Sequence, residues 1–110
     1  MKILILEDNL IWSSRLAKTV KSLGHEALVL ARIPAQMPAG DVALLNLGNG
    51  QLCSAEIIET LKGQGTKTVA HAGHKEKPLL DQGNEMGVDL VVTNSTLTYK
   101  LEETLSQLSV

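Results

Sequence analysis

The chain has few aromatic residues and a single cysteine. Trp12 and Tyr99 are its only tryptophan and tyrosine, and phenylalanine is absent, so the core must consist of Leu, Val, Ile and Ala. This scarcity argues against the aromatic stacking that single-stranded nucleic acids and flat cofactors use. The lone cysteine, Cys53, excludes an internal disulfide and any multi-cysteine metal site. A reducing cytoplasm is the compartment that fits this cysteine usage.

Basic excess and long apolar runs are also absent. Ten Lys and Arg oppose twelve Asp and Glu, for a net charge of −2, so we expect neither nucleic acid nor an anionic membrane as a partner. The apolar start, Ile3–Leu6, is too short for a signal peptide or a membrane span. A length of 110 residues predicts one domain, 1–110.

Short apolar runs alternate with amphipathic stretches along the whole chain. Asn9 and Gly24 are placed to begin and end the first helix. Strands are predicted over 3–6, 26–31, 41–47, 66–72 and 88–93, and helices over about 10–23, 55–62, 78–86 and 96–108. In the first helix the apolar positions are Leu10, Ile11, Leu16, Val20 and Leu23. This alternation predicts an α/β fold, doubly wound around a parallel sheet.

The second crossover is too short for a full helix. Only Arg32–Gly40 separates the second and third strands, and this segment contains Pro34 and Pro38. We therefore predict a shortened or missing helix there. The uncovered sheet would then expose an apolar patch to which Ile33, Met37 and Val42 contribute, and this patch would favour a homodimer.

Polar residues end several of the predicted strands. Glu7 and Asp8 follow the first strand, Asn46 ends the third, and His71 lies in the fourth before the small residue Ala72. Gly87-Val-Asp89 leads into the fifth strand, which contains Val91 and is followed by Asn94. Across the whole chain this combination resembles the CheY-like receiver domains of two-component response regulators.

The resemblance implies a five-stranded sheet in the order 2-1-3-4-5 and assigns a family position to each of these residues. Glu7 and Asp8 match the metal-holding acidic pair. Asn46 occupies the position of the phosphate-accepting aspartate, His71 that of the switch Ser or Thr, and Asn94 that of the phosphate-binding lysine. Val91 takes the place of the switch aromatic residue.

These replacements predict a degenerate phosphorylation site at Asn46, His71 and Asn94. An amide is not a nucleophile for phosphoryl transfer, and Asp41 lies about 16 Å away along the strand at about 3.3 Å per residue. No lysine occurs between Lys77 and Lys100, and no hydroxyl occurs within Val69–Ala72. We therefore expect no catalytic residue and no enzyme activity.

The acidic pair leaves the question of a metal ion open. Loss of one carboxylate weakens a site for Mg²⁺, which dehydrates reluctantly. Glu7 and Asp8 are then a solvated acidic edge near a helix N-terminus, or they form a weak Mg²⁺ or Ca²⁺ site with Asn46. A transition-metal site that adds His71 is a further alternative. Otherwise His71 is a hydrogen-bonded histidine, and Trp12 is either partly buried packing or an interface anchor.

The function that we predict is that of a stand-alone pseudo-receiver, which acts in signal transduction through a protein partner such as a histidine kinase or another signalling protein. The resemblance implies an interaction face that includes Met86, Val91, Thr98, Tyr99 and Glu102. Three alternatives stay open: a receiver phosphorylated by unusual chemistry, a domain excised from a longer protein, and a small-ligand sensor. The sensor would use the crevice at the strand ends, lined by Glu7, Asp8, Asn46, Gly48, His71 and Asn94.

Overall fold

Five parallel strands form the single sheet of the protein in a computed structural model that describes residues 1–108. The order is β2-β1-β3-β4-β5, as predicted. The strands are β1 (Lys2–Leu6), β2 (Glu26–Leu30), β3 (Val42–Asn46), β4 (Lys67–Ala72) and β5 (Leu90–Thr93). Each lies within one or two residues of the apolar run that predicted it.

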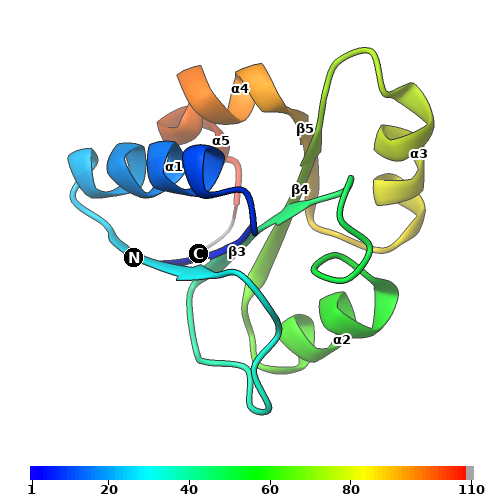
Figure 1. Cartoon of the computed structure of the whole chain (residues 1–110), viewed down its shortest axis with the longest axis horizontal. Coiled ribbons are helices and arrows are strands. Elements are labelled where there is room, and N and C mark those ends of the chain that lie inside the picture. The colour runs from blue at the N-terminus through cyan, green and yellow to red at the C-terminus, as the bar shows by residue number, and fades with distance from the viewer. Residues whose placement is uncertain (109–110) are drawn as a thin grey trace.

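Helices cover both faces of the sheet. They are α1 (Leu10–Ser22), α2 (Ala55–Gly63), α3 (Lys77–Glu85), α4 (Asn94–Tyr99) and α5 (Leu101–Ser106). Figure 1 shows α1, α4 and α5 on one side of the sheet and α2 and α3 on the other. The predicted doubly wound α/β fold is therefore confirmed. Within residues 1–108, no helix combines the length and the hydropathy needed to cross a bilayer.

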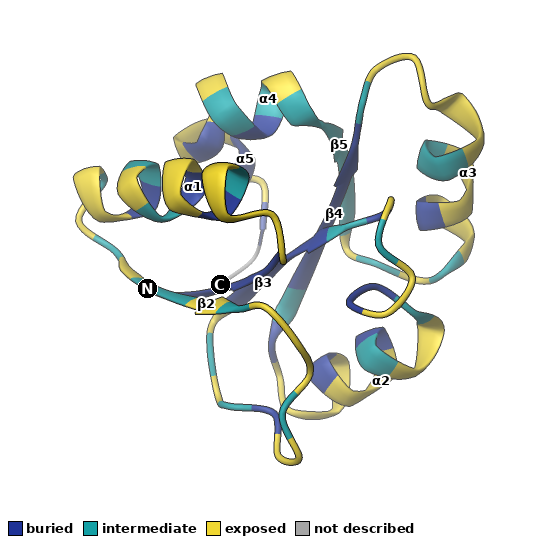
Figure 2. Cartoon of the chain, in the orientation of Figure 1, coloured by how far each residue is buried: buried dark blue, intermediate teal, exposed yellow. Residues whose placement is uncertain are grey.

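Alternate residues of the strands build two separate cores. One, on the α1 side, contains Ile3, Ile5, Val42, Leu44 and Val69 together with Leu16 and Val20 of α1 and Leu97, Leu101 and Leu105 of α4 and α5. The other, on the α2 side, contains Leu4, Leu6, Ala43, Leu45, Ala70 and Ala72 together with Ile58 and Leu61 of α2. Both faces of the central strands are thus apolar, which explains the near-continuous hydrophobic runs. Figure 2 shows these strands as the buried centre of the molecule.

Local signals fix both ends of α1. The side chain of Asn9 accepts a hydrogen bond from the Trp12 amide at 3.0 Å, and Gly24 follows the helix with φ +86°. The apolar stripe of this helix is shorter than the sequence predicted, because Leu10 and Ile11 are 76% and 78% exposed. They precede the buried stripe, which runs through Ser13, Leu16 and Val20.

The connection between β2 and β3 contains no helix, as predicted, but it leaves no open patch of the expected kind. Met37 is buried in the core on the α2 side, and its carbonyl accepts a hydrogen bond from Gln64 Nε2 at 3.1 Å. Val42 is fully buried in the opposite core. Of the three predicted residues only Ile33 is exposed, so the predicted patch is wrong. The loop folds back onto the sheet, and the Met37 side chain covers the face on the α2 side.

The predicted last helix is two helices. Lys100 leaves the helical region with φ −131° and ψ 38°, and it separates α4 from α5. Leu97, Leu101 and Leu105 are buried in one core on both sides of this break. Their spacing therefore continues through it, and no Gly or Pro marks the position.

Candidate functional site

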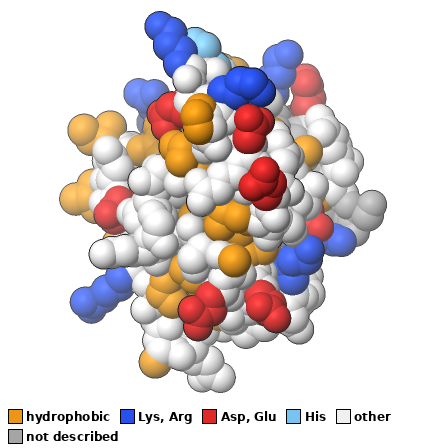
Figure 3. Space-filling view, turned by 90° about the vertical axis from the view of Figure 1, so that its right-hand side faces the viewer, with side chains coloured by type: hydrophobic (Ala, Val, Ile, Leu, Met, Phe, Trp, Pro, Cys, Tyr) orange, Lys and Arg blue, Asp and Glu red, His pale blue; other side chains and the backbone are white. Residues whose placement is uncertain are grey.

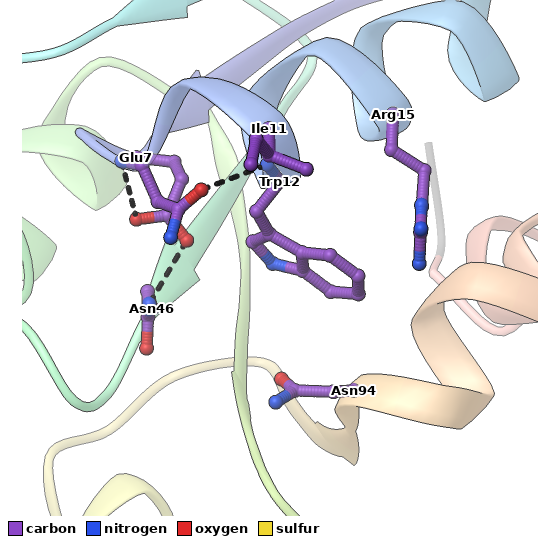
Figure 4. A pocket seen from close by; sticks show the side chains of 7 residues that line it. Glu7, Ile11, Trp12, Arg15, Asn46 and Asn94 are labelled. Atoms are coloured by element: carbon purple, nitrogen blue, oxygen red, sulfur yellow. Dashed lines mark hydrogen bonds between the residues drawn. The ribbon is translucent and has the colours of Figure 1, made fainter.

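The carboxyl ends of the strands bring the predicted polar residues to one edge of the sheet. Glu7 follows β1, Asn46 is the last residue of β3, and His71 is its register partner on β4. Asn94 begins α4 directly after β5. Figure 4 shows the side chains of Glu7, Asn46 and Asn94 around one pocket.

Glu7 is a buried carboxylate held by neutral donors. The residue is only 2% exposed. Its Oε1 accepts a hydrogen bond from Asn46 Nδ2 at 2.9 Å, and its Oε2 accepts from the amides of Asp8 and Asn9 at 3.1 and 3.4 Å. Within residues 1–108, Glu7 takes part in no ion pair. Three donors therefore stabilise a charge that no cationic side chain of the described residues neutralises.

Asn46 is fixed at both ends of its amide. While Nδ2 donates to Glu7, Oδ1 accepts a hydrogen bond from the Gly48 amide at 2.9 Å. An aspartate at this position would place a second carboxylate against Glu7, and two like charges at that distance disfavour joint ionisation. The amide removes this repulsion without a metal ion or a shared proton.

His71 and Asn94 form a second polar pair beside the first. His71 is 1% exposed, and its Nδ1 lies 2.7 Å from Asn94 Oδ1. The oxygen can only accept, so Nδ1 carries the proton. Burial lowers the pKa of His71, while the hydrogen bond to Asn94 and the charge of Glu7 oppose that shift. The structure thus shows a hydrogen-bonded, buried histidine.

A pocket of about 430 Å³ opens above these pairs. Its lining comprises Glu7, Asn9, Ile11, Trp12, Arg15, Asn46 and Asn94. The Trp12 ring lies 6.3 Å from the His71 ring, tilted by 51°, and the Arg15 guanidinium lies 5.8 Å from the centroid of the indole. The indole therefore lies between the sheet edge and the guanidinium.

This lining differs from the crevice that the sequence predicted. Glu7, Asn46 and Asn94 are present, whereas Asp8 and Gly48 are exposed and do not line the pocket, and His71 does not line it either. Trp12 is half-buried and packs against the core on the α1 side. The lining residues that the sequence did not reveal come from the start of α1. The spacing of Ile11 and Arg15, one helical turn apart immediately after the acidic pair, was the available signal.

The donor set does not fit a hard divalent cation. Mg²⁺ and Ca²⁺ bind oxygen ligands, yet Asn46 presents its amino group to Glu7 and its oxygen to Gly48. The Glu7 oxygens already accept three hydrogen bonds, and Asp8 is exposed. Within residues 1–108 no three His, Cys, Asp or Glu side chains are grouped for metal binding. In this arrangement these side chains are not grouped as metal ligands, and the weak site with Asp8 and the transition-metal alternative with His71 stay predictions.

The residues of the predicted interaction face differ in exposure. Met86 and Val91 are half-buried and pack against the core on the α2 side. Thr98 is also half-buried and donates to the Asn94 carbonyl at 2.9 Å, whereas Tyr99 is 81% exposed and Glu102 is exposed. Tyr99 is thus the large exposed side chain of the set.

Figure 3 views the side that carries α3. It shows hydrophobic side chains near the middle of that face, with charged groups around them.

Cys53 is not a nucleophile at this edge. It is buried just before α2, and burial raises the pKa of its thiol to about 11. Because the thiolate is the reactive form, the side chain serves as a small apolar group in the core on the α2 side.

Several solved structures of response-regulator receivers and CheY-like proteins share this fold. CheY4 of Vibrio cholerae superposes with a TM-score of 0.77 at 16% identity, over 96% of each chain. The receiver domain of the Francisella response regulator 1452 gives 0.72 at 13% identity, over 96% of this chain and 97% of that one. A CheY-like receiver domain protein from Methanospirillum hungatei gives 0.70 at 18% identity, over 96% and 94%. The chain has the CheY-like receiver fold.

This likeness concerns the fold, since the identities are low. No protein-family model matches the chain, and no curated protein matches its sequence. Asn46, His71 and Asn94 nevertheless lie at the carboxyl edge of the sheet, and their assignment to a degenerate phosphorylation site stays a prediction.

Proposed function

We propose that this receiver-fold chain is a non-enzymatic signalling module that acts through phosphorylation-independent protein–protein interaction. One observation carries the proposal. At the position of the phosphate-accepting aspartate, the Asn46 amide donates a hydrogen bond to Glu7 at 2.9 Å. The group is neither a nucleophile nor a metal ligand in this orientation.

The neighbouring contacts support the same conclusion. Receiver phosphorylation requires a cation or hydroxyl to bind the arriving phosphoryl oxygens. Here the positions of the switch hydroxyl and the lysine hold His71 and Asn94, which bind each other at 2.7 Å. Val91 packs into the core where the switch aromatic would move. Without a phosphorylation switch, the chain presents one docking state, or the binding of a protein partner sets its conformational equilibrium.

Phosphorylation is tested with acetyl phosphate and Mg²⁺, followed by mass spectrometry of the intact protein. We expect no acid-labile phosphoryl adduct on the wild-type chain. Beryllofluoride with Mg²⁺ should leave the backbone chemical shifts of β5 and α4 unchanged. A phosphoryl adduct on Glu7 or Asp8, or shifts that spread from Asn46 to Val91 and Tyr99, would contradict the proposal.

The role of the amide is tested with Asn46→Asp. Without divalent cations we expect this variant to lose about 2 kcal/mol of unfolding free energy, because a half-buried carboxylate replaces the donor to Glu7. Added Mg²⁺ should restore part of that loss and bind more tightly than to the wild type. Asn84→Asp, on the exposed surface of α3, adds the same charge and serves as the control. Equal unfolding free energies for the two variants, with and without Mg²⁺, would be evidence against the role given to Asn46.

The docking surface that we propose centres on Tyr99 at the end of α4. Exposed aromatic residues dominate interface energies, and truncation of such an anchor costs about 2 kcal/mol or more. A partner captured from the source cell and identified by mass spectrometry should bind Tyr99→Ala at least tenfold more weakly, whereas Tyr99→Phe retains the ring and most of the affinity. Unchanged affinity for Tyr99→Ala would place the interface elsewhere.

A further inference from the structure

The pocket at the strand ends combines a buried negative charge with an aromatic wall. Glu7 is 2% exposed and forms no ion pair within residues 1–108. Buried carboxylates in proteins are normally paired with a cation or a metal. Because the donor set does not fit a hard metal ion, the charge of Glu7 calls for a partner of a different kind.

Glu7 can accept one more hydrogen bond. A carboxylate offers about four lone-pair positions, and the three donors of Glu7 are Asn46 Nδ2 and the amides of Asp8 and Asn9. Asp8 is exposed nearby and adds negative charge to the same edge. A ligand with a positive head group can therefore donate one hydrogen bond to Glu7 without breaking the network that holds it.

Trp12 supplies the second element of the site. Figure 4 shows its indole extending from α1 into the space between Glu7, Asn46 and Asn94. The Arg15 guanidinium already lies 5.8 Å from the centroid of that ring, so the indole takes a planar cation at its face. Arg15 is exposed, and no ion pair holds it within residues 1–108, so it can leave the ring. While Arg15 lies over the ring, it would compete with any other cation for the face of the indole.

We propose that this pocket binds a small organic cation with an ammonium or guanidinium head group, placed between the carboxylate of Glu7 and the indole of Trp12. The volume of about 430 Å³ lies within the range of small-molecule sites, which is about 300–1,000 Å³. The site needs neither phosphorylation nor a protein partner. Its test on the isolated chain is therefore independent of the docking proposal.

The test uses four probes with alkyl chains of three or four carbons. Butylguanidinium and butylammonium carry the positive head group, butylurea is the neutral isostere, and butyrate is the anion. Trp12 is the only tryptophan, so its fluorescence reports the pocket directly, and backbone chemical shifts provide a second readout. Both cations should bind saturably in the millimolar range and perturb residues of the pocket. The urea and butyrate should bind at least about tenfold more weakly.

Three variants sharpen the test. Glu7→Gln keeps the shape of the side chain and should weaken binding at least about tenfold. Arg15→Ala removes the competing cation and should tighten binding a few-fold. Lys18→Ala removes an exposed charge of the same helix that does not line the pocket, and it should change nothing. If Glu7→Gln fails to fold, Trp12→Leu, followed by chemical shifts, should lose the binding.

Several results would overturn the proposal. Equal binding of butylurea would show that the charge is irrelevant. Stronger binding of butyrate, with Arg15→Ala weaker than the wild type, would assign the site to an anion. Saturable binding of MgCl2 at constant ionic strength that is lost in Glu7→Gln would assign it to a metal ion. Absence of any saturable response to either cation would refute it directly.

Discussion

At the scale of single residues, two neutral amide side chains, and not charged groups, make the hydrogen bonds that hold Glu7 and His71 at this sheet edge. Asn46 satisfies a buried carboxylate with one end and a loop amide with the other. Asn94 fixes the tautomer of His71. Since an amide carries no net charge, Asn46 and Asn94 add no charge of their own that would need a counter-ion. The cost is that Glu7 stays unneutralised, and the pocket that we assign to an organic cation depends on it.

His71 predicts a pH dependence of stability. Burial holds its pKa below the ordinary value, so the unfolded chain binds a proton that the folded chain rejects. The contribution of His71 to the unfolding free energy is complete above about pH 6.5, the ordinary pKa of histidine. This contribution is lost as the pH falls below that value. We therefore expect the unfolding free energy from urea titration to decrease between about pH 7.5 and about pH 5.5.

The control compares two histidines. His71→Gln should flatten this pH dependence, because glutamine does not titrate, whereas His74→Gln should leave it as in the wild type, because His74 is exposed. An identical slope for the wild type and His71→Gln would show that His71 does not govern the effect.

Part of the site could be predicted from the sequence. Glu7, Asn46, His71 and Asn94 lie at strand ends, and parallel strands gather their carboxyl ends at one edge. Trp12 and Arg15 could not be placed, because their position depends on how α1 packs over that edge. The pairing of Asn46 with Glu7 depends on side-chain orientation, which no spacing encodes.

At the scale of the elements, the boundaries follow from local chemistry and the irregularities from packing. Apolar runs and caps predicted the strands and α1 to within a residue or two, since these signals are short-range. The interruption at Lys100 was missed because the leucine spacing continues through it and both helices bury their leucines in one core. The exposure of Leu10 and Ile11 was missed because helical spacing does not say where burial begins.

The ends of α1 and α2 offer a matched pair of glycine substitutions. Gly24 has φ +86° with no atom within 4 Å of an added Cβ, and Gly63, at the end of α2, has the same free space without a positive φ. Gly24→Ala should cost about 1 kcal/mol of unfolding free energy, because an L residue is strained there. Gly63→Ala should add a few tenths up to about 1 kcal/mol. Thermal or urea unfolding of both variants measures the difference, and equal effects would be inconsistent with the backbone account.

At the scale of the whole molecule, the sheet is covered unequally. The face with α1, α4 and α5 is closed by helices, while the other face is closed by α2, α3 and the helix-free loop of residues 31–41 (Figure 1). The alternation of strands and helices predicted the parallel sheet, and the receiver resemblance supplied its order. That Met37 would fill the place of a helix could not be predicted, because the contact joins segments far apart in the sequence.

The edge position of β2 has a consequence for local unfolding. This strand pairs with β1 alone, and none of its residues is fully buried. Segments with few buried contacts open at lower free energy than the global transition. In native-state hydrogen exchange we expect the β2 amides bonded to β1 to exchange faster than those of β3 and β4.

The opening of β2 reaches the pocket through one hydrogen bond. The Glu7 amide donates to the Leu30 carbonyl at 3.1 Å, so the residue that carries the buried charge is tied to this edge strand. The Glu7 amide should therefore exchange at the rate of β2, and not at the slower rate of its neighbours in β1 that bond to β3. If it does, each transient release of the edge strand also loosens the carboxylate, and a ligand that pairs with Glu7 would slow the exchange of β2.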